Sequence, residues 1–203
     1  MRKLVHEPHK FYNTVHMNSF WIGAFTGAEC DRICNYYDKR DLDSGTTGLD
    51  GEVDVKYRQS NICFDNKNSD NAWIFDRLFD IVEETNHKFF QYELIGFEFF
   101  QYTTYNKHQY YNYHIDTIFN GYEVNKDTNL CRKLSISILF NDASEFDGGE
   151  FEICAGDPND PFSHKLNKGD AIFFPSYLLH RVKSIKEGIR KSLVVWVLGP
   201  KWR

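Results

Sequence analysis

A histidine and an aspartate stand two residues apart in the segment Tyr113–Thr117, and a third candidate ligand, His180, follows 64 residues after Asp116. Residues i and i+2 of a β-strand point to the same face, so the imidazole of His114 and the carboxylate of Asp116 can converge. Two imidazoles and one carboxylate form the facial triad of non-haem iron sites, which leaves positions open for a co-substrate and O2. The spacing alone is a weak signal, because the chain contains eight histidines and 29 acidic residues.

A buried cation strengthens this interpretation. Arg190 lies ten residues after His180, directly after a Lys186–Gly188 turn. A strand period of two places four side chains on one face: Arg190, Ser192, Val194 and Trp196. A guanidinium that points into a barrel is costly unless an anion pairs with it. A dicarboxylate that reaches in from the metal would supply that anion.

Two helices are expected upstream of these residues. Thr26 and Glu29 have the spacing of a capping box, and the apolar residues after them repeat at helical spacing for about three turns. The second helix has Ser69 or Asp70 as its N-cap and extends to about Lys88. Its apolar stripe consists of Ile74, Leu78, Ile81 and Val82. Cys30 and Cys34 are interpreted as small core residues of the first helix.

From Tyr92 onward the apolar pattern changes to a period of two, which is typical of strands. The expected strands are 94–102, 110–118, 135–140, 150–154, 171–174 and 189–198, with a turn at 147–149 and a loop at 155–167. Helices followed by short strands indicate an α+β fold, a β-sandwich or jelly roll with helices on one side. No repeat or linker interrupts the chain, so residues 1–203 are expected to form one domain.

Composition excludes several classes of protein. The chain has 203 residues and a formal net charge of −5, whereas nucleic-acid binders carry a basic excess. Hydrophobic residues make up 41% and aromatic residues 17%, which is enough to bury a core. No apolar run approaches the roughly 18 residues of a membrane span, and the N-terminus lacks a signal-peptide pattern. Five dispersed cysteines do not indicate a disulfide framework. We therefore expect a soluble cytoplasmic protein without a membrane partner.

Several short segments, spread in order over roughly residues 92–198, carry a family resemblance. They are Gln101-Tyr102, Tyr111–Asp116, Leu134-Ser135, Phe146–Glu150, Gly169–Ala171, Phe174–Ser176, His180–Val182 and Gly188–Arg190. This set resembles the Fe(II)/2-oxoglutarate-dependent dioxygenases, specifically their prolyl-4-hydroxylase-like branch, and most closely the bacterial PKHD-type hydroxylases. Upstream, Tyr57–Ser60 is similar to a segment that precedes the long helix of that branch.

The resemblance implies a double-stranded β-helix (jelly-roll) core over about residues 92–200, with a helical N-terminal part over about residues 1–91. It implies that His114, Asp116 and His180 bind Fe(II) and that Arg190 binds the distal carboxylate of 2-oxoglutarate. These four residues are the expected catalytic set. Tyr102, Ser135 and Trp196 are further candidates for contacts with 2-oxoglutarate, and core packing is the competing interpretation for each of them. O2 is the implied oxidant, and ascorbate is a candidate stimulant.

The implied reaction hydroxylates a C–H bond, with prolyl residues of a peptide or protein as the expected target and succinate and CO2 as products. The same chemistry on a free amino acid or small metabolite is the alternative substrate class. A non-catalytic, cupin-like metal-binding jelly roll is a different class, which the buried Arg190 disfavours. A nucleic-acid demethylase is disfavoured by the net charge of −5. A monomer or homodimer is expected.

Overall fold

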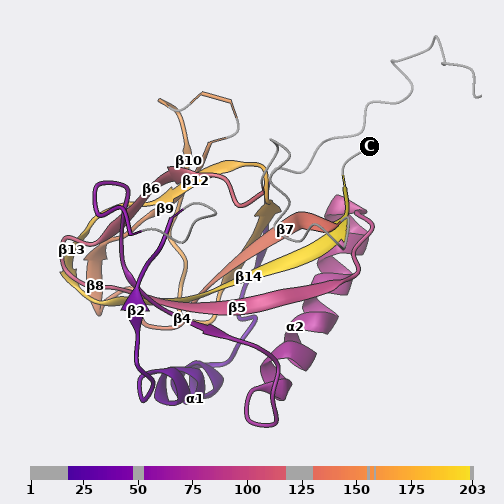
Figure 1. Cartoon of the computed structure of the whole chain (residues 1–203), viewed down its shortest axis with the longest axis horizontal. Helices are drawn as coiled ribbons and strands as arrows, with labels where there is room; N and C mark the ends of the chain where they lie inside the picture. Colours follow the sequence, from indigo (N-terminus) through magenta and orange to yellow (C-terminus); the bar gives the residue numbers. More distant parts are fainter. Residues whose placement is uncertain (1–17, 48–52, 118–129, 155, 158, 202–203) are drawn as a thin grey trace, which may run out of the picture.

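The computed structural model describes residues 18–47, 53–117, 130–154, 156–157 and 159–201. The predicted strand 110–118 and the N-terminal part of the helical region therefore extend in part outside the described residues. Strands dominate the described chain, and a few helices accompany them (Figure 1). No helix among these residues has the length and apolar character that crossing a bilayer requires.

The first helix, α1 (Gly27–Tyr37), begins at the predicted capping box. The Thr26 hydroxyl accepts the backbone N–H of Glu29, and the Glu29 carboxylate accepts the backbone N–H of Thr26 at 2.7 Å. Both groups satisfy N–H groups that a helix start leaves without partners. The apolar side chains of α1 are buried, and Cys30 is a core residue as predicted.

The second helix, α2 (Ala72–Thr85), continues as one π-helical turn, η2 (Asn86–Phe90). The predicted cap at Ser69 or Asp70 is wrong, because Asn71 is the N-cap residue and its side chain makes no capping bond. The Asn71 amide instead donates to the Asp65 carboxylate at 2.9 Å. This bond fixes the start of the helix to the end of a neighbouring strand.

The strands form two larger sheets and one two-stranded pair. The seven-stranded sheet has the order β1-β11-β7-β14-β5-β4-β2, the five-stranded sheet β10-β9-β12-β6-β3, and the pair β13-β8. In the first sheet the bounds are β1 Ser19–Trp21, β11 Ala171–Pro175, β7 Leu130–Leu139, β14 Arg190–Pro200, β5 Gly96–Tyr105, β4 Asn61–Asp65 and β2 Asp43–Ser44. In the second they are β10 Phe162–His164, β9 Phe151–Cys154, β12 Leu179–Val182, β6 Tyr110–His114 and β3 Arg58–Gln59. The pair consists of β13 Ile185–Gly188 and β8 Phe146–Gly148.

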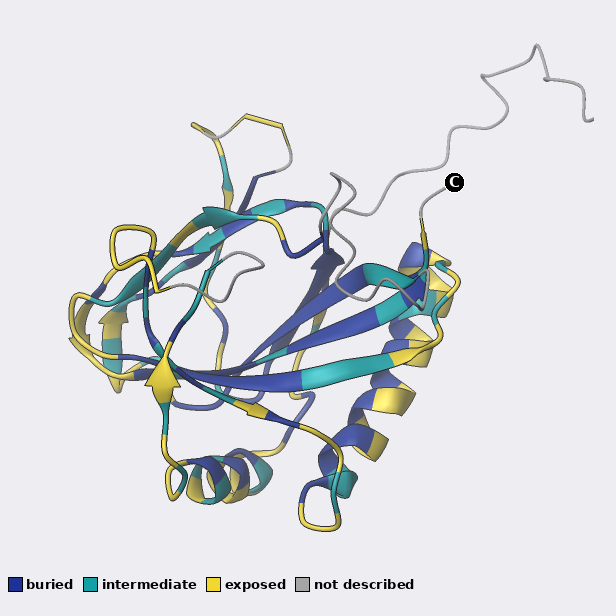
Figure 2. Ribbon diagram, viewed as in Figure 1, coloured by how far each residue is buried: buried dark blue, intermediate teal, exposed yellow. Residues whose placement is uncertain are grey.

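The seven-stranded sheet separates two apolar cores. Figure 2 shows long buried stretches in its central strands β5, β7 and β14. One core joins α1 and α2 to the helix-facing side chains of β5, β7 and β14, among them Tyr102, Ile136 and Leu193. The second core joins the opposite face of the sheet to β9 and β12 of the five-stranded sheet. Figure 1 shows both helices on one side of β5, β7 and β14, and β6, β9, β10 and β12 on the other.

The long predicted strands are present with shifted ends. β7 starts five residues earlier than predicted and β5 ends three residues later. The predicted turn at 147–149 overlaps β8, and the predicted loop at 155–167 contains β10. The sequence analysis missed the short strands β1 to β4, because two- to five-residue segments carry too little periodicity to be recognised. Two of them matter for the pocket, since β3 pairs with β6 and β4 pairs with β5.

Candidate active site

The structure brings His114, Asp116 and His180 together. One ligand atom from each lies within 4.8 Å of the others, which is the arrangement of a group that can hold a metal ion. His114 and His180 are cross-strand partners at the end of β6 and the start of β12, and their ring centroids are 4.1 Å apart. Asp116 lies beyond the end of β6, which is at His114. The strand alternation that was expected to point His114 and Asp116 to the same face therefore does not extend to Asp116. The backbone N–H of Asp116 instead donates to the Ser176 carbonyl at 2.9 Å.

Hydrogen bonds orient both imidazoles for coordination. Nδ1 of His114 lies 2.8 Å from the Asn112 carbonyl oxygen, and Nδ1 of His180 lies 2.9 Å from the Leu178 carbonyl oxygen. A carbonyl oxygen can only accept a hydrogen bond, so each ring donates from Nδ1. In a neutral ring the lone pair of Nε2 is then free to bind a metal. The Nε2 atoms lie 3.8 Å and 3.5 Å from the oxygens of Asp116. A hydrogen bond from the ring nitrogen that does not bind the metal is typical of histidines in metal sites.

The electrostatics of the three groups suit a dication. Burial lowers the pKa of His114 to about 3, so its imidazole is neutral at neutral pH. Burial alone would raise the pKa of Asp116, but its charge interactions with His180, His114 and Arg132 lower it below its ordinary value. The hydroxyl of Ser135 acts in the same direction by donating to the Asp116 carboxylate at 2.6 Å. The donor set is therefore two imidazole nitrogens and one ionised carboxylate, which fits Fe(II).

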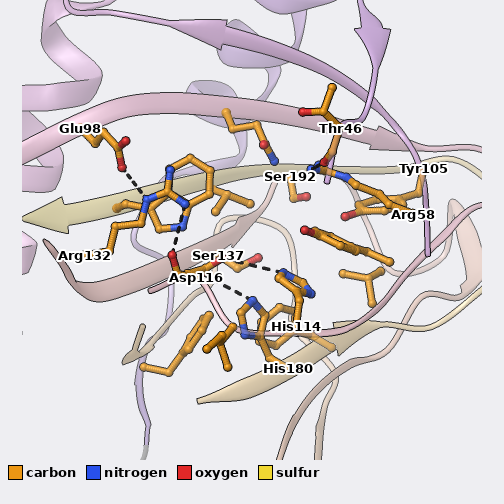
Figure 3. Close-up of a pocket in the computed structure, with 18 of the residues that line it drawn as sticks. Thr46, Arg58, Glu98, Tyr105, His114, Asp116, Arg132, Ser137, His180 and Ser192 are labelled. Atoms are coloured by element: carbon orange, nitrogen blue, oxygen red, sulfur yellow. Dashed lines mark hydrogen bonds and ion pairs between the residues drawn. The ribbon is translucent and has the colours of Figure 1, made fainter. Parts of the chain in front are cut away.

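A pocket of about 530 Å³ contains these three residues and Arg190 (Figure 3). Arg190 is only 2% exposed, and its Nη1 donates to the Ser192 hydroxyl at 2.8 Å. No carboxylate among the described residues forms an ion pair with it, and burial lowers its pKa. The face of β14 that carries Arg190, Ser192, Val194 and Trp196 lines the pocket, as the strand period predicts.

Trp196 forms one wall of this pocket. The Arg132 guanidinium lies 3.7 Å from the centroid of the Trp196 ring and forms an ion pair with Glu98. The indole Nε1 of Trp196 is buried without a hydrogen-bond partner in the described part of the chain. An acceptor on a bound molecule would satisfy it.

Tyr102 was expected to contact the co-substrate, and the structure places it elsewhere. Its ring stacks on Tyr37 of α1 at 4.6 Å, and its hydroxyl donates to Asp38 at 3.0 Å. The physical reason is strand parity: Tyr102 pairs with Leu193, whereas Arg190 pairs with Tyr105. Tyr105, which the sequence analysis did not single out, therefore lines the pocket, and Tyr102 belongs to the helix-side core.

Ser135 lies on the pocket side of β7 but contacts a metal-site residue. Besides Asp116, its hydroxyl oxygen lies 2.9 Å from that of Ser176. Both bonds place Ser135 behind the carboxylate rather than against a co-substrate. Among the pocket residues that the sequence analysis missed, Tyr105 follows from the parity of β5 once one strand register is known. Glu98 and Arg132 do not, because they lie at or beyond register shifts of β5 and β7 against β14.

We expect that Ser135→Ala lowers the affinity for Fe(II) by about 10- to 100-fold, because the Asp116 carboxylate loses its charge-assisted hydrogen bond. Calorimetric titration of Fe(II) without O2 measures this. Ser137→Ala is the matched control, since Ser137 lies on the same face of the same strand without a bond to Asp116. Equal metal affinity of the Ser135 variant and the wild type would show that this bond does not orient the carboxylate.

A sequence model of the 2OG-Fe(II) oxygenase superfamily matches residues 100–198. Over this stretch, which is just under half of its length, the chain is similar to the 2OG-Fe(II) oxygenase superfamily. The matched stretch contains the three grouped residues and Arg190. Fe(II) and 2-oxoglutarate are the metal and co-substrate of this superfamily, and the donor set described above is consistent with both.

Among curated relatives, a PKHD-type hydroxylase from a Psychrobacter species is 33% identical over 98 residues, which is 47% of this chain and 36% of that protein. A PKHD-type hydroxylase from Prochlorococcus marinus is 42% identical over 64 residues, 32% of this chain and 28% of that protein. The match thus covers only about a third of the length of these relatives.

Solved structures of prolyl hydroxylases share the fold of this chain. A Pseudomonas putida prolyl-4-hydroxylase superposes with a TM-score of 0.68 at 17% identity, covering 92% of this chain and 94% of that one. A viral collagen prolyl hydroxylase from Paramecium bursaria Chlorella virus-1, solved as a 2OG complex, gives 0.67 at 20% identity, covering 91% and 97%. A Trichoplax adhaerens prolyl hydroxylase in complex with a peptide fragment gives 0.70 at 14% identity, covering 89% and 83%.

Proposed function

We propose that this oxygenase uses Fe(II) and 2-oxoglutarate to hydroxylate a C–H bond of a prolyl residue in a peptide or protein, with release of succinate and CO2. The observation that carries the proposal is one pocket in which a two-histidine, one-aspartate group lies together with a buried arginine that lacks an anionic partner among the described residues. We further propose that the two sheets form a double-stranded β-helix around this pocket.

The side chains have separable roles in this proposal. His114, Asp116 and His180 would hold the iron, and Arg190 would bind the distal carboxylate of 2-oxoglutarate through a bidentate, charge-assisted contact. When bound, iron and 2-oxoglutarate supply the oxygen-activating chemistry that the side chains lack. The carbonyl groups of Asn112 and Leu178 hold the two imidazole rings in their coordinating orientation.

The pocket walls exclude water and orient the substrate. Tyr111 stacks on the His114 ring at a centroid distance of 3.5 Å, and Phe174 lies 4.6 Å from the His180 ring. These rings cover the imidazoles with apolar surface. Phe64 and Ile115 line the pocket although they are 48% and 40% exposed. A peptide longer than one residue would cover them, and apolar surface removed from water contributes to binding.

Supporting comparisons point to the same substrate class. The solved relatives include prolyl hydroxylases, one of them in complex with a peptide, and the curated relatives are PKHD-type hydroxylases. These likenesses motivate peptidyl proline as the first substrate to test for this chain.

We expect that a proline-containing peptide stimulates succinate formation more than free L-proline does, because only the peptide extends to the rim residues Phe64 and Ile115. Succinate release is measured with the peptide, with the same peptide carrying alanine at the proline position, and with free proline. Mass spectrometry of the peptide then locates an added oxygen atom.

Stronger stimulation by free proline would favour the alternative substrate class, a free amino acid or small metabolite. An absence of 2-oxoglutarate turnover in all reactions, with metal bound, would instead favour the non-catalytic metal-binding protein. The alanine peptide is the control for stimulation without hydroxylation.

A further inference from the structure

A second buried guanidinium lines the pocket, and neither the metal group nor Arg190 accounts for it. Arg58, on the edge strand β3, is 4% exposed. Its Nε donates to the Ser60 hydroxyl at 2.8 Å and its Nη1 donates to the Thr46 carbonyl at 3.0 Å. Its Nη2 is buried and has no hydrogen-bond partner in the described part of the chain. Two neutral acceptors thus orient the side chain, and the Nη2 amino group, which carries two N–H bonds, remains without an acceptor.

No carboxylate among the described residues forms an ion pair with Arg58. A buried cation without an anion is destabilising, because burial removes its hydration and nothing replaces the lost interaction. Arg58 lines the same pocket as the metal group, so a ligand in that pocket can supply the missing anion.

Neighbouring groups hold the Arg58 guanidinium rigidly. On one side it lies 4.4 Å from the centroid of the Tyr111 ring, which in turn stacks on His114. The chain also passes close to the Arg58 side chain at Gly45, where an added Cβ would lie 2.6 Å from its Nε and 2.2 Å from the Ser60 hydroxyl oxygen. Only glycine allows so close an approach. The guanidinium is therefore preorganised rather than free to move toward solvent.

Arg58 and Arg190 approach the same tyrosine. The Arg190 guanidinium lies 5.9 Å from the centroid of the Tyr105 ring. Burial raises the pKa of Tyr105, whereas the positive charges of Arg58 and Arg190 and a side-chain hydrogen bond with Arg58 lower it. Figure 3 shows Arg58 and Tyr105 at one end of the pocket. Glu98 and Arg132, which pair with each other, lie at the opposite end.

The charges in the pocket favour a dianionic ligand. Among the described lining residues, Asp116 is the one carboxylate that is not in an arginine ion pair, and it belongs to the metal group. The positive charges of a divalent metal ion and of two guanidiniums therefore exceed the single negative charge of Asp116, so the net charge of the pocket is positive. A dicarboxylate that spans from the metal to the Arg190 end would offset most of it.

We propose that Arg58 binds the distal carboxylate of 2-oxoglutarate together with Arg190, so that two guanidiniums flank one carboxylate at the Tyr105 end of the pocket. This inference rests on the proposed function, because it takes 2-oxoglutarate as the co-substrate. It adds a residue from an edge strand outside the matched stretch 100–198 to the co-substrate site.

The test compares two ligands that differ only at the distal carboxylate. Calorimetry measures the affinities of 2-oxoglutarate and 2-oxopentanoate for the Fe(II)-loaded protein without O2. We expect that Arg58→Gln weakens 2-oxoglutarate binding by about tenfold and changes 2-oxopentanoate binding by less than about twofold. Arg58→Lys is expected to recover part of the loss, because it retains a point charge without the fork geometry.

Lys191→Gln is the matched control, since Lys191 neighbours Arg190 in the chain but pairs with Asp38 outside the pocket. It should leave both affinities unchanged. If Arg58 had a purely structural role, Arg58→Gln would weaken the binding of both ligands to the same extent. This result would overturn the inference. Unchanged 2-oxoglutarate affinity of Arg58→Gln would also overturn it and would point to a carboxylate of the primary substrate. If the wild type bound no 2-oxoglutarate, the proposed function would fail as well.

Discussion

Replacing both His114 and Asp116 by alanine is expected to abolish Fe(II) binding and 2-oxoglutarate turnover. The double substitution removes one of the two imidazoles and the only carboxylate of the metal group that the described residues form. It leaves His180 as a lone ligand, which cannot fill one face of an octahedral site. We expect an affinity loss of at least about 100-fold, because changes to groups that merely support a ligand already cost about 10- to 100-fold.

Calorimetric titration of Fe(II) without O2 measures the metal affinity, and succinate release measures turnover. Asp142→Asn is a control for the loss of a negative charge, since Asp142 is exposed and lies outside the metal group. The assignment of the three ligands would be wrong if the double variant decarboxylated 2-oxoglutarate at the wild-type rate.

Arg190→Ala is expected to weaken 2-oxoglutarate binding by at least about tenfold, while Fe(II) affinity stays nearly unchanged. A charge-assisted hydrogen bond contributes roughly 1.5–3 kcal/mol, and 1.4 kcal/mol corresponds to a factor of ten. The substitution also leaves the ligand carboxylate desolvated beside fewer cations. The metal ligands come from β6, β12 and the segment after β6, so the loss should not extend to them.

Titration of 2-oxoglutarate into the Fe(II)-loaded variants without O2 measures this effect. Arg190→Lys should recover part of the affinity, because a point charge remains although the fork geometry is lost. If Arg58 also contacts the carboxylate, Arg190→Ala should retain weak, carboxylate-dependent binding. An Arg190→Ala protein with wild-type affinity would show that this cation has another role.

Local patterns predicted those parts of the site that depend on a few neighbouring residues. The capping box at Thr26 and Glu29 fixes the start of α1 from four residues of sequence. The pocket face of β14 follows from strand period alone, because the strand is long and its alternation is regular. The prediction of the metal group depended on resemblance as well, since the segment between His114 and Asp116 leaves the strand.

The features that the sequence analysis missed depend on pairing between strands that are distant in the sequence. The position of Tyr102 depends on the register of β5 against β14, and a shift by one residue exchanges the two faces. Arg58 enters the pocket because β3, only two residues long, pairs with β6. No periodicity can mark so short a strand, and its orientation follows from the tertiary contacts of Ser60 and Thr46.

The helices that cover one face of the seven-stranded sheet limit how far the chain can be shortened. Residues 100–198 carry the superfamily match, yet six of their large buried side chains face α1 and α2: Phe100, Tyr102, Leu134, Ile136, Leu193 and Val195. At roughly 1.5–3 kcal/mol for each side chain, their exposure would cost about 9–18 kcal/mol. That is comparable with the entire stability of a typical domain, about 5–15 kcal/mol. We therefore expect that residues 100–198 do not fold on their own, and that a fragment that retains the pocket must begin before α1.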